Sequence, residues 1–235
     1  MSEYFTFGGI SSNDYDVLLL ADDMTGTQYE YATVSVAGRT GDLHRGNKRY
    51  KNKNRKLVIY AGEQAESRIE SLNAALLAVT DYARLQSTIH PDWYTLGQYG
   101  GDIKPKKGAG YSAARVELSF DCKPQKYLVT GDNAVYVADG DTIENPTLYP
   151  AKPMLYVTGV GTLSIGRYAI EVLEEVTDMV IDCDMESAYS STDGTSYNSK
   201  IRAFENEFMQ IDSGEQEIGL DTGMTLSIVP RWYTL

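Results

Sequence analysis

The sequence is poor in cationic side chains and has no long apolar run. Of its 235 residues, 21 are Lys or Arg and 33 are Asp or Glu, so the net charge is −12 at pH 7. Nucleic-acid binding depends largely on neutralised phosphates, so this balance argues against a protein whose main task is to grip DNA or RNA. No apolar run approaches the roughly 20 residues of a membrane span, and no membrane insertion is expected. The first residues lack a secretory pattern, which predicts a soluble protein synthesised in the cytoplasm.

Cysteine and histidine are also scarce, which limits the chemistry that the chain can support. Cys122 and Cys183 are the only cysteines, and His44 and His90 the only histidines. Both cysteines fall on apolar faces of expected strands without a C-x-x-C motif, which predicts buried thiols rather than a disulfide or a metal site. G-x-S-x-G, H-E-x-x-H and Walker-type motifs do not occur. We therefore expect no cofactor, no metal and no enzymatic activity.

The apolar pattern predicts a mainly β chain with one helix, a β-rich α+β fold. "RVELSFDC" at 115–122 alternates apolar and polar residues, as a half-buried strand does. A helix is expected at about 66–85, where Ser67 and Glu70 have the spacing of a capping box. Its apolar stripe, expected to pack on a sheet, comprises Ile69, Leu72, Leu76, Val79 and Ala83.

The chain changes character after Pro124, and we place a domain boundary at about residue 129. The expected domains are 1–128, which carries the helix, and 129–235. The second contains short apolar runs separated by turn signals and has no second strong helix, which predicts a β-sandwich.

The acidic residues Asp182, Asp184 and Glu186 are the most enzyme-like feature. Paired carboxylates can hydrolyse glycosides or hold a hard cation. Alternate residues on one strand face are also what a solvated sheet surface presents. We favour the solvated face, with Cys183 and Met185 on the opposite, apolar face.

One basic segment interrupts this acidic chain, "VSVAGRTGDLHRGNKRYKNKN" at 34–54. A nucleic-acid patch would work against the negative background, and the G-x-x-x-x-G-K-[ST] spacing of a phosphate loop is missing. A structural arm that grips another protein remains. Asp42 is the only acid near its basic residues, which are Arg39, Arg45, Lys48, Arg49, Lys51 and Lys53, followed by Arg55 and Lys56.

Several pieces resemble, in order, the distal tail (Dit) proteins of long-tailed siphophages. The similarity covers nearly the whole chain. In chain order, the pieces are "FTFGGISSNDYDV", "VSVAGRTGDL", "CKPQKYLVTGD", "NPTLYPAKPMLYVTGVGTLSI", "VIDCDMESAY" with "NEFMQIDSGEQEIGL", and "IVPRW".

The resemblance implies an N-terminal β-sandwich-like domain carrying a helix, followed by a galectin-like β-sandwich. It further implies a homohexameric ring in the virion, at the distal end of the phage tail. Such a ring joins the tail tube protein to the tail-associated fibre or lysin protein and, in some phages, to receptor-binding proteins. The chain has no room for the inserted carbohydrate-binding modules of longer relatives.

In such a ring, the basic segment is expected to contact the neighbouring subunit. Glycines allow sharp turns, and arginines can bind carboxylates in a bidentate manner. An internal Arg39–Asp42 pair is the alternative. The candidate interface residues are Gly38, Arg39, Gly41, Asp42, Arg45, Gly46, Lys48 and Arg49.

Two other functions remain as alternatives, a free carbohydrate-binding lectin and a glycosidase that uses the acidic residues above. DNA is expected to pass through the ring without specific binding, because acidic walls repel phosphate.

Overall fold

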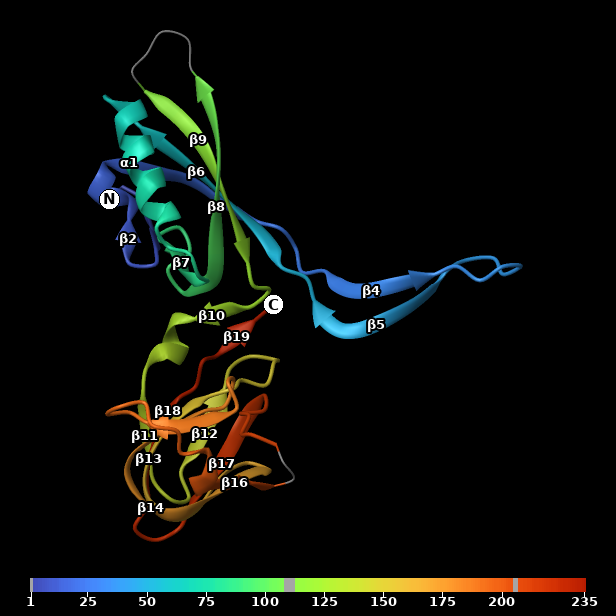
Figure 1. Cartoon of the computed structure of the whole chain (residues 1–235), viewed down its shortest axis with the longest axis vertical. Coiled ribbons are helices and arrows are strands. Elements are labelled where there is room, and N and C mark those ends of the chain that lie inside the picture. The colour runs from blue at the N-terminus through green and yellow to red at the C-terminus, as the bar shows by residue number, and fades with distance from the viewer. Residues whose placement is uncertain (1, 108–112, 205–206) are drawn as a thin grey trace. The chain divides into compact units, whose positions relative to one another are not determined.

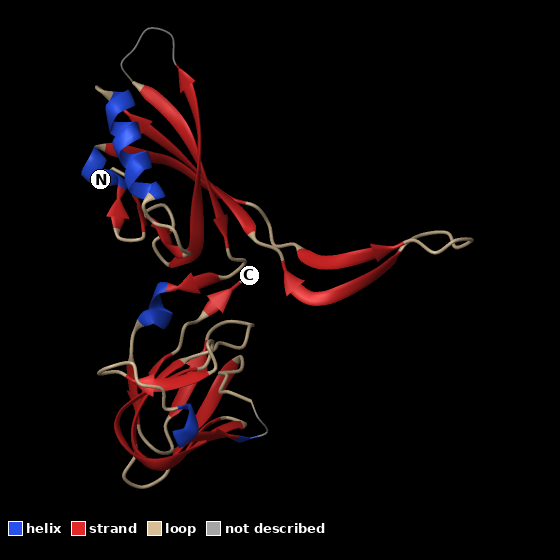
Figure 2. Cartoon of the chain, in the orientation of Figure 1, coloured by secondary structure: helices blue, strands red, loops and turns tan. Residues whose placement is uncertain are grey.

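The computed structural model describes residues 2–107, 113–204 and 207–235. The chain divides into two compact units, Met1–Lys126 with Leu235, and Tyr127–Thr234. Strands dominate both, as Figure 2 shows. In the described part of the chain, no helix has the length and apolar character needed to cross a membrane. The expected mainly β fold with one α-helix is confirmed.

The first unit is built on one antiparallel sheet with the strand order β2-β1-β7-β8-β9-β6-β3 (Figure 1). The helix α1, Ala65–Leu77, packs on β8 and β6. The strands are β1 Phe5–Phe7, β2 Ile10–Ser11, β3 Val17–Met24, β6 Lys53–Ala61, β7 Ala83–Ser87, β8 Trp93–Lys107 and β9 Ala114–Cys122. A short 3-10 helix, Ser12–Tyr15, connects β2 to β3.

Strand β9 bears out the alternating pattern at 115–122. Its apolar residues are buried and its polar residues lie between them on the other face. The buried set is Val116, Leu118, Phe120 and Cys122. Cys122 and Cys183 are both free buried thiols, as predicted.

The helix is shorter than the predicted 66–85, because the last two residues of the predicted apolar stripe lie outside it. Val79 lies beyond the helix and approaches Gly8, and Ala83 begins β7, where it pairs with Gly97. An apolar stripe does not distinguish a longer helix from a helix followed by a strand. The expected capping box is also wrong, since the N-cap is Gln64, in a left-handed conformation and without a side-chain hydrogen bond.

Two residues of the basic segment lie inside the first unit. The alternation of β6 places Lys53 and Arg55 on its buried face. The guanidinium of Arg55 is fully buried and binds Asp22 in a bidentate manner at 2.8 and 2.6 Å. It also donates to the Leu85 carbonyl at 2.8 Å and to the Thr95 hydroxyl at 3.0 Å. Arg55 is therefore part of the core rather than of a surface patch.

The second unit is organised around a long hairpin, β13 Met154–Ile165 and β14 Tyr168–Asp182. One end of the hairpin pairs with β18 and β15, and the other end with β17 and β16. The remaining pairs are β11–β18 and β12–β17. Their bounds are β11 Val135–Val137, β12 Thr142–Asn145, β15 Ser187–Ser190, β16 Ile201–Ala203, β17 Gly214–Leu220 and β18 Thr225–Val229.

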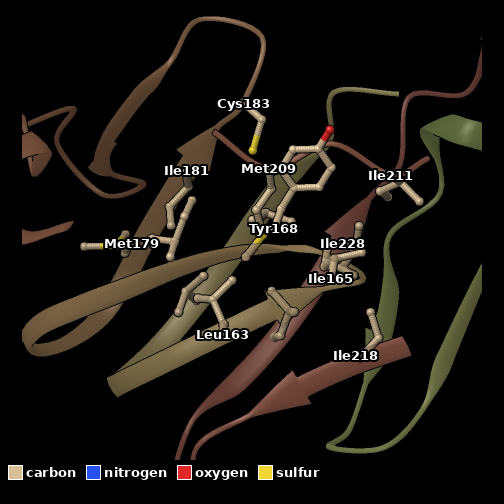
Figure 3. Close-up of a cluster of buried hydrophobic side chains, with 14 of the residues drawn as sticks. Leu163, Ile165, Tyr168, Met179, Ile181, Cys183, Met209, Ile211, Ile218 and Ile228 are labelled. Carbon is tan, nitrogen blue, oxygen red and sulfur yellow. The ribbon is translucent and has the colours of Figure 1, made fainter. Parts of the chain in front are cut away.

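The strands paired with one end of the hairpin and those paired with its other end enclose one apolar cluster. Figure 3 shows side chains of β13, β14, β17 and β18 converging on it, together with Met209 and Ile211. Because both ends of the hairpin contribute, the pairing defines two facing layers, as in a β-sandwich. Short elements complete the chain: 3-10 turns at Val129–Asp132 and Asn198–Lys200, and the strands β10 Lys126–Leu128 and β19 Tyr233–Thr234.

Candidate subunit interface

The candidate interface segment forms a two-stranded hairpin that we call the arm, residues 29–50. It consists of β4, Tyr29–Val34, and β5, Leu43–Tyr50, which pair as a separate sheet. Figure 1 shows the two strands as a ribbon of their own. Nearly all of their described side chains are exposed. The arm therefore has almost no core of its own, and its side chains are available to a partner.

Residues that pair directly across an antiparallel hairpin share a face, so the register assigns an aromatic face. Tyr29 lies opposite Tyr50 with the ring centroids 5.4 Å apart and edge to face. Tyr31 packs edge to face on His44 at 4.6 Å, although Tyr31 is still 54% exposed. The three tyrosines of this face are 36–54% exposed, so the face offers apolar surface to a partner.

The other face of the arm is basic and aliphatic. Arg45 lies opposite Ala32, and Arg49 lies opposite Glu30, with Nε and Oε2 3.5 Å apart. Lys48 belongs to β5, but its side chain is outside the part of the chain that the structure describes. This face therefore presents mainly positive charge at its described positions.

The glycines divide into two roles. Gly38 and Gly41 have φ of +79° and +86°, the left-handed region that glycine adopts without strain, and they form the turn at the tip. Gly46 is not a hinge, contrary to the sequence prediction. It lies in β5 beneath the ring of Tyr29, where an added Cβ would stand 2.8 Å from Cε1.

The internal pair between Arg39 and Asp42 is not formed. Asp42 accepts a hydrogen bond from the Ser35 hydroxyl at 3.2 Å, and the Arg39 amide donates to the Val36 carbonyl at 3.1 Å. Among the described residues, the guanidinium groups of Arg39 and Arg45 have no ion-pair partner. These two exposed cationic groups are therefore available to carboxylates of another molecule.

Sequence reasoning found the basic residues but missed the aromatic face. Tyr29 and Tyr31 alternate in "QYEYATV", which was a usable signal for one strand. The pairing was hidden because a bulge intervenes: Glu30 pairs with Arg49, whereas its neighbour Tyr31 pairs with Gly46. Two additional residues on β5 break the simple opposition of the strands.

The acidic residues do not form the predicted solvated strand face. Strand β14 ends at Asp182, which is buried and accepts bidentate hydrogen bonds from Arg231 at 2.8 and 3.0 Å. Asp184 and Glu186 lie in the following turn, and Met185 is exposed rather than buried. The prediction failed because acidic and apolar residues continue to alternate in the sequence after the strand has ended and the turn has begun.

The environment of Asp182 also argues against the glycosidase alternative. Burial alone would raise its pKa, but Arg231 and the amides of Asp184 and Met185 stabilise the carboxylate and hold the pKa below its usual value. A general acid requires the opposite shift. In the described part of the chain, no cluster of His, Cys, Asp and Glu could hold a metal ion.

These features define a two-unit, β-rich protein with a sheet-and-helix unit, an exposed arm and a β-sandwich. No protein-family model and no curated protein matches the sequence. Among solved structures, the chain is similar to SPP1 Dit (gp 19.1), a phage protein described as a paradigm of the hub adsorption apparatus in phages that infect Gram-positive hosts. The TM-score is 0.71 at 16% identity, with all of both chains covered.

Two further structures are more distant. They are the phage P2 baseplate in its activated conformation with Ca, at TM-score 0.52, and with Sr, at 0.51. Each is 10% identical and covers 97% of this chain and 98% of the other. The chain thus has a Dit-like fold, and the structural resemblance predicted from the sequence pieces is confirmed.

Proposed function

We propose that the chain is a distal tail protein of a long-tailed phage. Six copies form a ring in the virion that joins the tail tube protein to the tail-associated fibre or lysin protein and to receptor-binding proteins where these occur. The protein is synthesised in the host cytoplasm and has a structural rather than a catalytic role. The Dit-like fold over the full length supports this function.

The observation that carries the ring is the arm. A small exposed hairpin with almost no core of its own is marginally stable, so its aromatic face gains most by burial against another molecule. In a cyclic assembly, each copy presents one patch to a different patch on the next. The arm supplies the first patch, and the acidic surface of a chain with net charge −12 offers carboxylates for Arg39 and Arg45.

Reversing the charge of the arm tests this proposal. The double variant Arg39→Glu, Arg45→Glu should weaken assembly at least tenfold, because two attractive contacts become repulsive. Sedimentation velocity over a concentration series measures the assembly, and circular dichroism checks that each chain is folded.

The matched control changes the net charge equally outside the arm. Lys152→Glu, Lys200→Glu alters two exposed ion pairs of the second unit, those with Asp184 and Glu174. Assembly should survive in this variant. If both double variants assemble like the unaltered protein, the arm is an ordinary surface hairpin and its proposed role in the ring is contradicted.

A further inference from the structure

In the second unit, the strands β11-β18-β13-β14-β15 lie side by side in that order. An open groove lies on the face of these strands that points away from the apolar core. Its volume is about 560 Å³. The inward side chains of these strands, such as Leu155 and Ile228, are buried in the core, so the groove lies on the opposite side of the sheet. The lining residues that matter here are Asp132, Tyr136, Tyr156, Thr158, Asp178 and Ser227.

The pairing register places two tyrosines on either side of a small floor residue. Ser227 of β18 pairs with Tyr136 of β11 on one side and with Tyr156 of β13 on the other. Neighbouring strands are about 4.8 Å apart, so the two tyrosine backbones are separated by roughly 10 Å. One ring in van der Waals contact with two walls needs about 7–8 Å. The spacing of the two backbones therefore leaves room for one ring between the tyrosine side chains.

The tyrosines are unusually open for such large side chains. Tyr136 is 86% exposed and Tyr156 is 41% exposed. An aromatic face offers a flat apolar surface to the C–H groups of a ligand. The Tyr156 hydroxyl donates to Met154 Sδ at 3.4 Å, so that tyrosine contributes its ring face rather than its hydroxyl. The two rings thus supply exposed apolar surface to a ligand in the groove.

Three hydroxyl side chains lie along the floor of the groove, of which Ser227 is the most buried, at 7% exposed. Thr158 and Thr225 form the next pair along the strands, with their Oγ1 atoms 2.6 Å apart, beside Ser227. A hydroxyl group both donates and accepts hydrogen bonds. This floor matches a ligand that itself carries several hydroxyls, and it matches a hydrocarbon ligand poorly.

The negative charge of the groove disfavours anionic ligands. Asp132 and Asp178 line it, and its lining includes no Lys, Arg or His. Asp178 accepts hydrogen bonds from the hydroxyls of Ser190 at 2.5 Å and Tyr197 at 3.2 Å. These bonds stabilise the carboxylate and lower its pKa, so it is charged at neutral pH. With both oxygens already engaged inside the protein, Asp178 is a weaker partner for a cation than a free carboxylate.

We propose that this groove binds a neutral saccharide, with one sugar ring between Tyr136 and Tyr156 and its hydroxyl groups on the Ser227, Thr158 and Thr225 floor. No residue of the groove belongs to the arm, so substitutions in the groove leave the arm itself unchanged. The protein would then contact uncharged sugars at the host surface directly, in addition to joining other tail proteins.

Binding of the full chain to an array of neutral, sialylated and sulfated oligosaccharides tests the proposal. A neutral oligosaccharide that binds on the array is then titrated by calorimetry. Tyr136→Ala and Tyr156→Ala should each weaken that binding roughly tenfold, since stacked aromatic contacts contribute about that factor. The control Tyr60→Ala removes a tyrosine of similar exposure, 37%, from the first unit and should leave binding unchanged.

Three results would overturn the saccharide site. One is the absence of binding to every neutral oligosaccharide. Another is unchanged affinity in both groove variants when circular dichroism shows them folded. The third is stronger binding of the anionic glycans, or of tetramethylammonium or spermidine, which would identify a charged ligand instead.

Discussion

At the residue scale, the buried Arg55–Asp22 pair links β6 to β3 inside the first unit. Its guanidinium also stacks over the ring of Trp93, 4.6 Å from the centroid, and the Ser87 hydroxyl donates to Asp22 at 2.5 Å. Every charged atom of this pair thus has a partner. A satisfied buried pair contributes little net stability, but removal of one partner leaves an uncompensated charge.

Replacing Asp22 should therefore destabilise the first unit strongly. Asp22→Asn leaves Arg55 charged and buried without its carboxylate, which typically costs about 3–5 kcal/mol. Urea unfolding followed by tryptophan fluorescence, to which Trp93 of the first unit contributes, measures the change. Lys56→Gln, which breaks the exposed Lys56–Glu117 pair, is the control and should leave the midpoint nearly unchanged. A midpoint in Asp22→Asn equal to that of the control would contradict this role for the pair.

The same pair predicts acid sensitivity. Desolvation opposes ionisation of Asp22, but the hydrogen bonds and charge of Arg55 outweigh it, so the folded-state pKa is lower than the usual value of 3.8. A carboxyl with a lowered folded-state pKa contributes its full stability above its unfolded pKa and loses it as the pH falls through the folded pKa. The thermal midpoint should be flat from neutral pH to about pH 5 and then fall below about pH 4.

Thermal unfolding between pH 2 and 7 measures this dependence. Asp22→Asn lacks the titrating group, so its loss of stability on acidification should be smaller. An acid dependence equal to that of the unaltered protein would show that other carboxylates control it.

Neither Arg55 nor Asp182 could be assigned its role from the sequence. Arg55 stands in a run of basic residues that reads as surface, and its partner is 33 positions away. Asp182 reads as part of an acidic strand face, and Arg231 is 49 positions away. Charge pairs of this kind exist only through the tertiary fold, whereas the alternation of β9 is local and was predicted correctly.

At the element scale, the sequence predicted strands better than the ends and contacts of elements. The helix end was missed because Val79 and Ala83 extend the apolar spacing beyond Leu77. The basic segment was predicted as an arm, but its pairing into a hairpin and its aromatic face were not. The bulge near Tyr31 removes the regular register that would have indicated them.

The aromatic face gives the arm a prediction of its own. Gly46→Val should displace the Tyr29 ring, because a Cβ at this position stands 2.8 Å from Cε1. If the rings are the surface that docks on the next copy, assembly should weaken roughly tenfold, or about 1.4 kcal/mol. Sedimentation velocity measures assembly, and urea unfolding should be unchanged.

Gly26→Val is the matched control for this substitution. Gly26 precedes β4, and an added Cβ there meets nothing within 4 Å. Assembly should be unaffected in the control. Normal assembly of Gly46→Val would place the docking surface elsewhere than on the aromatic face.

At the scale of the whole molecule, the proposed ring must let DNA pass without retaining it. Each copy contributes a net charge of −12, and in the proposed ring the exposed cations of the arm, Arg39 and Arg45, are engaged by carboxylates of the next copy. Phosphate binding needs exposed cations, so the ring should not retard a linear duplex at about 150 mM salt. An electrophoretic mobility assay measures this, and retardation at submicromolar protein would contradict a non-adhesive channel.

The ring itself is the central claim, and the mass of the unaltered protein in solution tests it most directly. Mass photometry, with negative-stain images of the same sample, should show a particle of about 156 kDa, six times the 26.0 kDa chain, with a central hole. A single species of 26.0 kDa throughout the concentration series, with no annular particles, would contradict the account.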